Sequence, residues 1–169
     1  EEIAVATNTM TNDEYNDLRA MTLLIKIFID GDTYKSIFEV LRRYEIKGID
    51  ILVKIQEDTC KEFPKFSKLL EDFVNAGKNK FFDSKSELEN ILSNPKIAKK
   101  FFEGKFTQNE LLLYRAKAHK DCSDDCTNVL KLAIKTIIDE KNLISKELDE
   151  YLREAFKFCD YRKFNFDEM

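Results

Sequence analysis

The sequence of 169 residues contains no tryptophan, one histidine, two prolines and four glycines. So few chain breakers argue against a turn-rich all-β fold, while 43% hydrophobic and 36% charged residues exclude an intrinsically disordered chain. A chain of this length can bury a core of its own within one domain. The sequence therefore predicts helices joined by short loops.

Long apolar runs and an excess of positive charge are also missing. No run approaches the roughly 20 residues that a membrane-spanning helix requires, and no basic-then-apolar signal sequence is present at the start. The formal net charge of −4 argues against non-specific binding to nucleic acid or to an anionic membrane surface. We therefore expect a cytoplasmic protein whose partner is neither a nucleic acid nor a membrane.

The first residues indicate a sequence that begins in the middle of a longer protein. It opens with Glu1, Glu2 and Ile3 and has no initiator Met. Residues 2–7 form a short apolar run that we interpret as a strand, and a single strand is not stable without neighbours. We therefore predict that residues 1–10 are a remnant strand or linker of an upstream domain, and that residues 11–169 form a single helical domain.

Helix start signals recur along the rest of the chain and predict an all-α bundle of about eight or nine helices. Each signal is a capping residue, a capping box or a first-turn proline. The predicted starts are at Thr11, Asp32, Pro64, Ser84, Asn94, Thr107, Ser123 and Ser145. A further, weaker helix is expected over residues 48–61, and Gly31, Gly77 and Gly104 are predicted to end helices.

Apolar residues at helical spacing predict which helix faces are buried. In the first helix the predicted buried face consists of Leu18, Met21, Ile25 and Phe28. The helix after Ser123 has a wider predicted stripe, formed by Val129, Leu130, Ala133, Ile134, Ile137 and Ile138.

The four cysteines are predicted to be free thiols, because a domain of this size without a secretory signal does not need disulfides. His119, Cys122 and Cys126 could lie on one side of a continuous helix and bind Zn²⁺, which is the alternative to a metal-free chain. A helix that starts at Ser123 would interrupt this arrangement. We therefore predict no metal site.

Four stretches of the chain carry a resemblance to a known family. They are residues 3–11 with Glu14 and Tyr15, residues 19–28, residues 102–118, and the tail from Phe158 to Lys163. The sequence resembles the C-terminal helical region of cobalamin (B12)-binding radical SAM proteins of the Fe–S oxidoreductase type. Thr107 departs from the pattern, since the family resemblance implies a Gly there.

The resemblance implies a parent enzyme with a cobalamin domain and a barrel that holds a [4Fe–4S] cluster and S-adenosylmethionine. The chain itself lacks the C-x3-C-x2-C motif that such a cluster requires, since Val129 follows Cys122 and Cys126 where the third cysteine would be. No nucleotide-binding, hydrolase or zincin motif is present either. We therefore expect this region to contain no catalytic residue and no cofactor, with the upstream barrel as its partner.

One turn of the helix after Thr107 is apolar all round, from Leu111 to Tyr114. Such a turn must be covered by this chain or by a partner. Asn109, Leu113, Tyr114 and Lys117 are therefore candidate residues facing a substrate or partner, with plain exposed positions at the helix rim as the alternative. The predicted function is an accessory domain that shields or helps bind the substrate of the parent enzyme; the alternative is a free-standing helical protein–protein interaction module.

Overall fold

The computed structural model describes residues 9–78, 85–102 and 109–163. These residues form an all-α fold, as predicted, with nine α-helices and one short 3-10 helix. The helices are α1 (Asn12–Phe28), α2 (Lys35–Arg43), α3 (Gly48–Glu57), α4 (Pro64–Lys78), α5 (Lys85–Leu92), α6 (Pro95–Phe102), α7 (Glu110–Asp121), α8 (Ser123–Glu140) and α9 (Lys146–Arg162). The 3-10 helix η1 (Thr59–Glu62) follows α3. Residues 2–7, for which we predict a strand, lie outside the described ranges.

Several predicted helix starts are confirmed. Thr11 accepts a hydrogen bond from the backbone N–H of Glu14, whose carboxylate accepts from the N–H of Thr11, so the capping box is complete. Pro64 is the first residue of α4. Asn94 accepts from the N–H of Lys96 at the start of α6, and Ser145 accepts from the N–H of Leu148 at the start of α9.

Other predicted boundaries are wrong. Asp32 does not cap α2, which begins after Tyr34 without a side-chain cap. Ser123 is the first residue of α8 and not its cap, because α7 runs into α8 with only Cys122 between them. The weaker helix predicted over residues 48–61 is split into α3 and η1, and Gly77 lies inside α4. The predicted positions Ser84 and Gly104 lie outside the described residues.

The helix predicted to start at Thr107 starts three residues later than that. Its N-cap is Asn109, whose side-chain oxygen accepts from the N–H of Leu112 at 3.2 Å. Asn is as good an N-cap as Thr, and a cap is decided by whichever side chain reaches a free N–H of the first turn.

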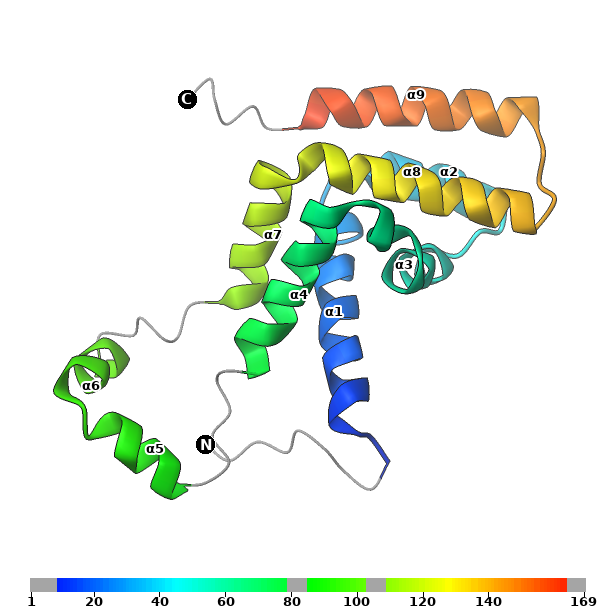
Figure 1. Cartoon of the computed structure of the whole chain (residues 1–169). Coiled ribbons are helices and arrows are strands. Elements are labelled where there is room, and N and C mark those ends of the chain that lie inside the picture. Colours follow the sequence, from blue (N-terminus) through cyan, green and yellow to red (C-terminus); the bar gives the residue numbers. More distant parts are fainter. Residues whose placement is uncertain (1–8, 79–84, 103–108, 164–169) are drawn as a thin grey trace.

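The core is one cluster of buried residues from α1, α2, α3, α4, α7, α8 and α9, in which α2 packs on α9 and α3 on α8. Figure 1 shows α2, α8 and α9 running across the molecule, with α1, α4 and α7 steeply inclined to them. All six residues of the predicted α8 stripe are buried. Tyr34 lies fully buried before α2, with its hydroxyl 3.3 Å from the Thr127 hydroxyl of α8, so its polar end is satisfied inside the core.

The buried face of α1 differs from the prediction. Phe28 is fully buried as predicted, Met21 and Ile25 are partly buried, and Leu18 is 57% exposed. Leu23, Leu24 and Ile27, which were not predicted, are fully buried. Apolar residues occupy most of this helix, so two different stripes satisfy the helical spacing. The packing of α1 against the other helices buries the stripe of Leu23, Leu24, Ile27 and Phe28.

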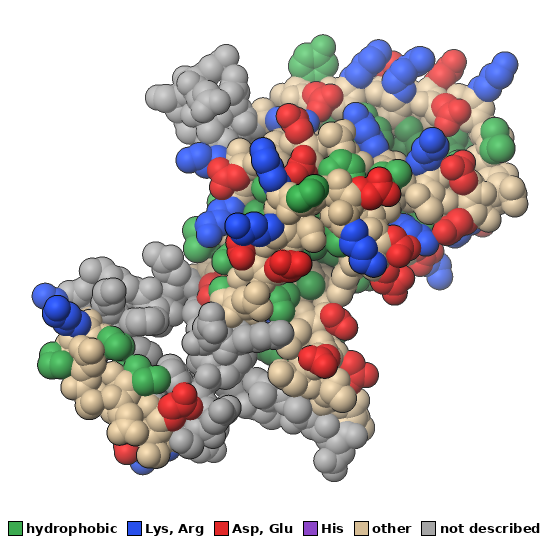
Figure 2. Space-filling view, in the orientation of Figure 1, with side chains coloured by type: hydrophobic (Ala, Val, Ile, Leu, Met, Phe, Trp, Pro, Cys, Tyr) green, Lys and Arg blue, Asp and Glu red, His purple; other side chains and the backbone are tan. Residues whose placement is uncertain are grey.

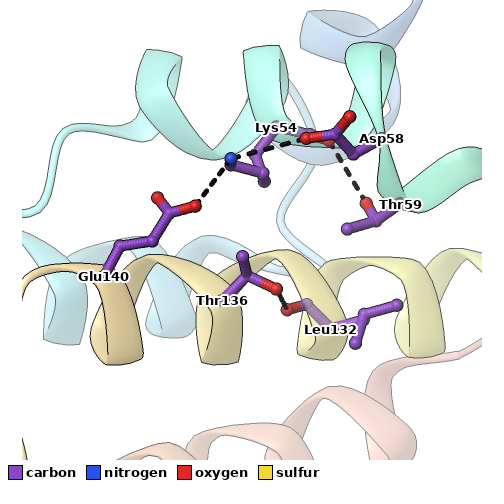
Figure 3. A network of polar contacts seen from close by, with 6 residues as sticks. All are labelled: Lys54, Asp58, Thr59, Leu132, Thr136 and Glu140. Atoms are coloured by element: carbon purple, nitrogen blue, oxygen red, sulfur yellow. Dashed lines mark hydrogen bonds and ion pairs between the residues drawn. The ribbon is translucent and has the colours of Figure 1, made fainter.

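A lysine joins α3 to the far end of α8. Lys54 Nζ lies 2.9 Å from Glu140 and 3.5 Å from Asp58, as Figure 3 shows. Both ion pairs are partly exposed, so each contributes little to stability. Only the pair with Glu140 connects the two helices, because Asp58 is the C-cap of α3 itself.

Helices α5 and α6 pack against each other and lie to one side of the remaining helices in Figure 1. Among the described residues, no helix combines the length and the apolar character that crossing a bilayer requires.

Candidate functional site

The predicted partner-facing residues lie on α7 but have different surroundings. Asn109 uses its side chain as the N-cap described above. Tyr114 packs against α4: its ring meets Phe73 edge-on at 5.3 Å, and its hydroxyl donates to the carbonyl of Asp72 at 3.2 Å. Lys117 places its ammonium 4.4 Å from the centre of the Tyr114 ring. Asn109 and Tyr114 therefore have structural contacts within this chain.

The leucines of the same helix are less covered. Leu112 is 51% exposed and Leu113 is 39% exposed, while Leu111 packs partly buried against the core. Leu113 and Lys117 are one helical turn apart and both exposed. An apolar side chain is thus left open beside a lysine, on the face that sequence reasoning identified.

The alternative metal ligands do not converge. α7 ends before Cys122 and α8 begins after it, which interrupts the continuous helix that a common side would need. His119 stacks on Tyr34 at 6.5 Å, and the thiol of Cys126 lies fully buried, 3.7 Å from the carbonyl of Ala118. Among the described residues, no three His, Cys, Asp or Glu side chains are close enough to share a metal ion.

Burial decides the protonation state of these groups. It raises the pKa of the Cys126 thiol far above its ordinary value, and it raises the pKa of Cys122 as well. Both cysteines therefore remain thiols at neutral pH, and they are free, as are Cys60 and Cys159. Thiols in this state are weak nucleophiles and weak metal ligands.

An open apolar site lies between α1 and α3. We call it the α1–α3 groove and define it by four apolar residues, Leu18, Met21, Ile49 and Val53. Its volume is about 940 Å³, and its other lining residues are Thr9, Met10, Glu14, Asp17, Gln56, Glu57 and Lys61. Ile49 is 47% exposed and Val53 is 37% exposed.

The groove follows from the way α1 and α3 pack. On α3, Leu52 and Ile55 are fully buried, whereas Ile49 and Val53, one turn apart, lie beside this buried face and stay exposed. On α1 the choice of the Leu23 stripe leaves Leu18 outside. Two helices with apolar residues on both faces therefore leave an apolar strip at the surface between them.

Charges at the rim of the groove are mostly negative. Glu14, Asp17 and Glu57 line it against one cation, Lys61. Figure 2 shows acidic side chains along α1 on the side of the molecule that it presents. The carboxylate of Glu14 stays ionised because its hydrogen bonds to Thr11 lower its pKa.

A side-chain amide spans the groove. Gln56 of α3 donates from Nε2 to the carbonyl of Asp17 on α1 at 3.1 Å. The Oε1 of the same amide is buried and has no hydrogen-bond partner among the described residues. Buried acceptors are rarely left unpaired, so the wall of the groove holds an unused acceptor.

Sequence reasoning missed the α1–α3 groove because it assigned Leu18 and Met21 to the core. The available signal was the excess of apolar residues on α1 and α3, which is more than one buried face of either helix can use. Which residues are left over is decided only when the helices pack.

No family model, no curated protein and no solved structure matches the chain.

Proposed function

We propose that this chain is a helical docking domain whose α1–α3 groove binds an amphipathic helix of a partner protein. The observation that carries the proposal is the exposure of Leu18, Ile49 and Val53 along one groove formed by two helices. Contiguous apolar surface rimmed by polar residues marks interaction sites, and a helix laid in such a groove buries its apolar face against both walls.

The charge of the rim specifies the partner. Three carboxylates against one lysine leave the groove acidic, and the whole chain carries a net charge of −4. A helix with Leu or Ile at positions i, i+3, i+4 and i+7 would fill the floor, and Lys or Arg on its flanks would face Glu14, Asp17 and Glu57. Charge complementarity of this kind speeds association and excludes acidic competitors.

The proposal is tested by selecting binders from a library of helical peptides with a fixed apolar stripe and random flanks. We expect selected peptides to be rich in Lys and Arg, and Val53→Glu to weaken their binding roughly tenfold or more, because it places a carboxylate against an apolar ligand. Ile144→Glu is the matched control, since Ile144 is 85% exposed outside the groove. Peptides that bind both variants and the unmodified chain equally would contradict the proposal.

Charge is tested in the same assay. Asp17→Asn combined with Glu57→Gln removes two of the three carboxylates of the rim and keeps the shape of the side chains. We expect slower association and a weaker dependence on salt, while the dissociation rate changes little. Glu150→Gln on the exposed surface of α9 is the control. Equal effects of the rim and control substitutions would remove the argument for a basic partner.

A second candidate function is an accessory domain of a cobalamin-dependent radical SAM enzyme, docked on the barrel of the same polypeptide. The exposure of Leu113 beside Lys117 supports it, because an uncovered leucine on α7 is what such a docking face requires. The test is the coding sequence upstream of residue 1. A barrel with C-x3-C-x2-C there supports this function, and a start codon there contradicts it.

A further inference from the structure

A second cavity of about 650 Å³ lies where the end of α9 meets the junction of α7 and α8. We call it the basic pocket and define it by Arg115, His119, Arg162 and Lys163. Its remaining lining residues are Asp32, Thr33, Leu112, Ala116 and Ser123. Three cations and one carboxylate line the pocket, and one of the cations, Lys163, is paired with two carboxylates outside the lining.

Arg115 is the cation of the basic pocket that the fold satisfies least. It is partly buried, and among the described residues no hydrogen bond or ion pair joins its guanidinium to another group. The guanidinium lies against Gly31, where an added Cβ would come within 2.9 Å of its Nη2. Gly31 therefore leaves the space that holds this cation at the pocket, and within the described ranges no carboxylate forms an ion pair with it.

The other two cations are held in place by the fold. Arg162 donates to the backbone carbonyl of Asp32 at 2.5 Å and lies over the Phe158 ring. Lys163 lies 2.9 Å from Asp160 and 3.2 Å from Asp124, both of which are exposed carboxylates. The charge of Lys163 is thus matched by carboxylates, whereas the side-chain bond of Arg162 goes to a neutral carbonyl, so Arg115 and Arg162 are the two cations left to a ligand.

We propose that the basic pocket binds the phosphate group of a small phosphate ester. Two guanidinium groups can grip a phosphate through paired N–H donors, and the Thr33 and Ser123 hydroxyls supply further donors at the wall. Leu112 and Ala116 form an apolar side against which the organic part of the ester can lie. The volume falls within the range of small-ligand sites, roughly 300–1,000 Å³.

His119 provides the readout because it is the only histidine in the chain and it lines this pocket. Burial and the nearby charge of Arg115 lower its pKa below the ordinary value. The charged and titratable groups around it are Asp32 and Tyr34 before α2, Arg115 on its own helix, and Arg162 and Lys163 from α9. A bound phosphate dianion would stabilise the imidazolium and raise this pKa.

The experiment follows the single imidazole signal by NMR while inorganic phosphate or phenyl phosphate is added at constant ionic strength, with sodium chloride as the reference. We expect phosphate to raise the pKa of His119 with a dissociation constant in the range of roughly 1 mM, and phenyl phosphate to bind several times more tightly. Equal binding of the two probes supports a site for free phosphate. No effect of either probe beyond the chloride reference overturns the site.

Two variants locate the effect. Arg115→Gln is expected to weaken both probes roughly fivefold or more, and to raise the pKa of His119 when no phosphate is present. Leu112→Ala should weaken phenyl phosphate alone. Arg153→Gln removes the same charge from the exposed face of α9 and is the control. Retention of phosphate binding in Arg115→Gln, with a dispersed spectrum of the folded chain, would contradict the assignment.

Discussion

The guanidinium of Arg19 occupies the space that a side chain at Gly77 would fill. Arg19 lies on α1 and Gly77 near the end of α4, and the contact brings the charged group over the Phe73 ring, 4.8 Å from its centre. The Nη2 atom also lies 3.4 Å from the carboxylate of Glu110 at the start of α7. Because Gly77 has no side chain, Arg19 of α1 can contact both α4 and α7.

This relationship predicts that the two residues are coupled. Gly77→Ala should gain less than the roughly 1 kcal/mol by which Ala favours a helix over Gly, because the methyl group displaces the flexible guanidinium of Arg19 from the Phe73 ring and Glu110. In the background of Arg19→Ala the same substitution should stabilise by the full amount, about 1 kcal/mol, because Ala favours helix over Gly. Urea unfolding of the four variants measures both effects. The same effect of Gly77→Ala in both backgrounds would show that Arg19 is not the obstacle.

The fold class and the α8 stripe could be predicted from the sequence because both depend on local spacing. The buried stripe of α8 follows from the i, i+3, i+4 spacing of its apolar residues. The caps at Thr11 and Ser145 depend only on a side chain that reaches a backbone N–H a few residues away. The face of α1 could not be predicted, because two stripes fit the same spacing.

The two candidate sites could not be read from local patterns either. The basic pocket joins Asp32 to Arg162, which are 130 positions apart. The α1–α3 groove depends on which apolar residues packing leaves outside. Of the residues of α7 predicted to face a partner, Leu113 is partly exposed. Tyr114 instead packs on Phe73 of α4.

The observed face of α1 gives a direct test of stability. Leu23→Ala should cost about 2–5 kcal/mol, because it empties a fully buried site. Leu18→Ala should stay within about 0.5 kcal/mol, since this side chain is largely exposed. Thermal or urea unfolding compares the two. A loss for Leu18→Ala as large as that for Leu23→Ala would show that Leu18 is buried too, and would contradict the observed face of α1.

The stability of the chain should depend on pH through His119. Its pKa in the folded chain is lowered, mainly by burial, so the unfolded chain takes up the proton first as the pH falls. Stability is therefore complete above the unfolded pKa of about 6.5 and is lost as the pH falls through the folded pKa.

His119→Phe keeps a ring stacked on Tyr34 and removes the titration. We expect the unmodified chain to lose stability between pH 7.5 and 5.5, roughly the window in which only histidine ordinarily titrates, and the variant to lose much less. Unfolding in urea at several pH values measures the slope. The same slope in both proteins would exclude His119 as its source.

The most direct test of the docking function is an NMR titration of the methyl-labelled chain with a basic amphipathic peptide selected as described above. We predict shifts concentrated at Leu18, Met21, Ile49 and Val53, with little change at Leu112 and Leu113. Shifts confined to Leu112 and Leu113, or spread evenly over the surface, would contradict the assignment of the α1–α3 groove as the binding site.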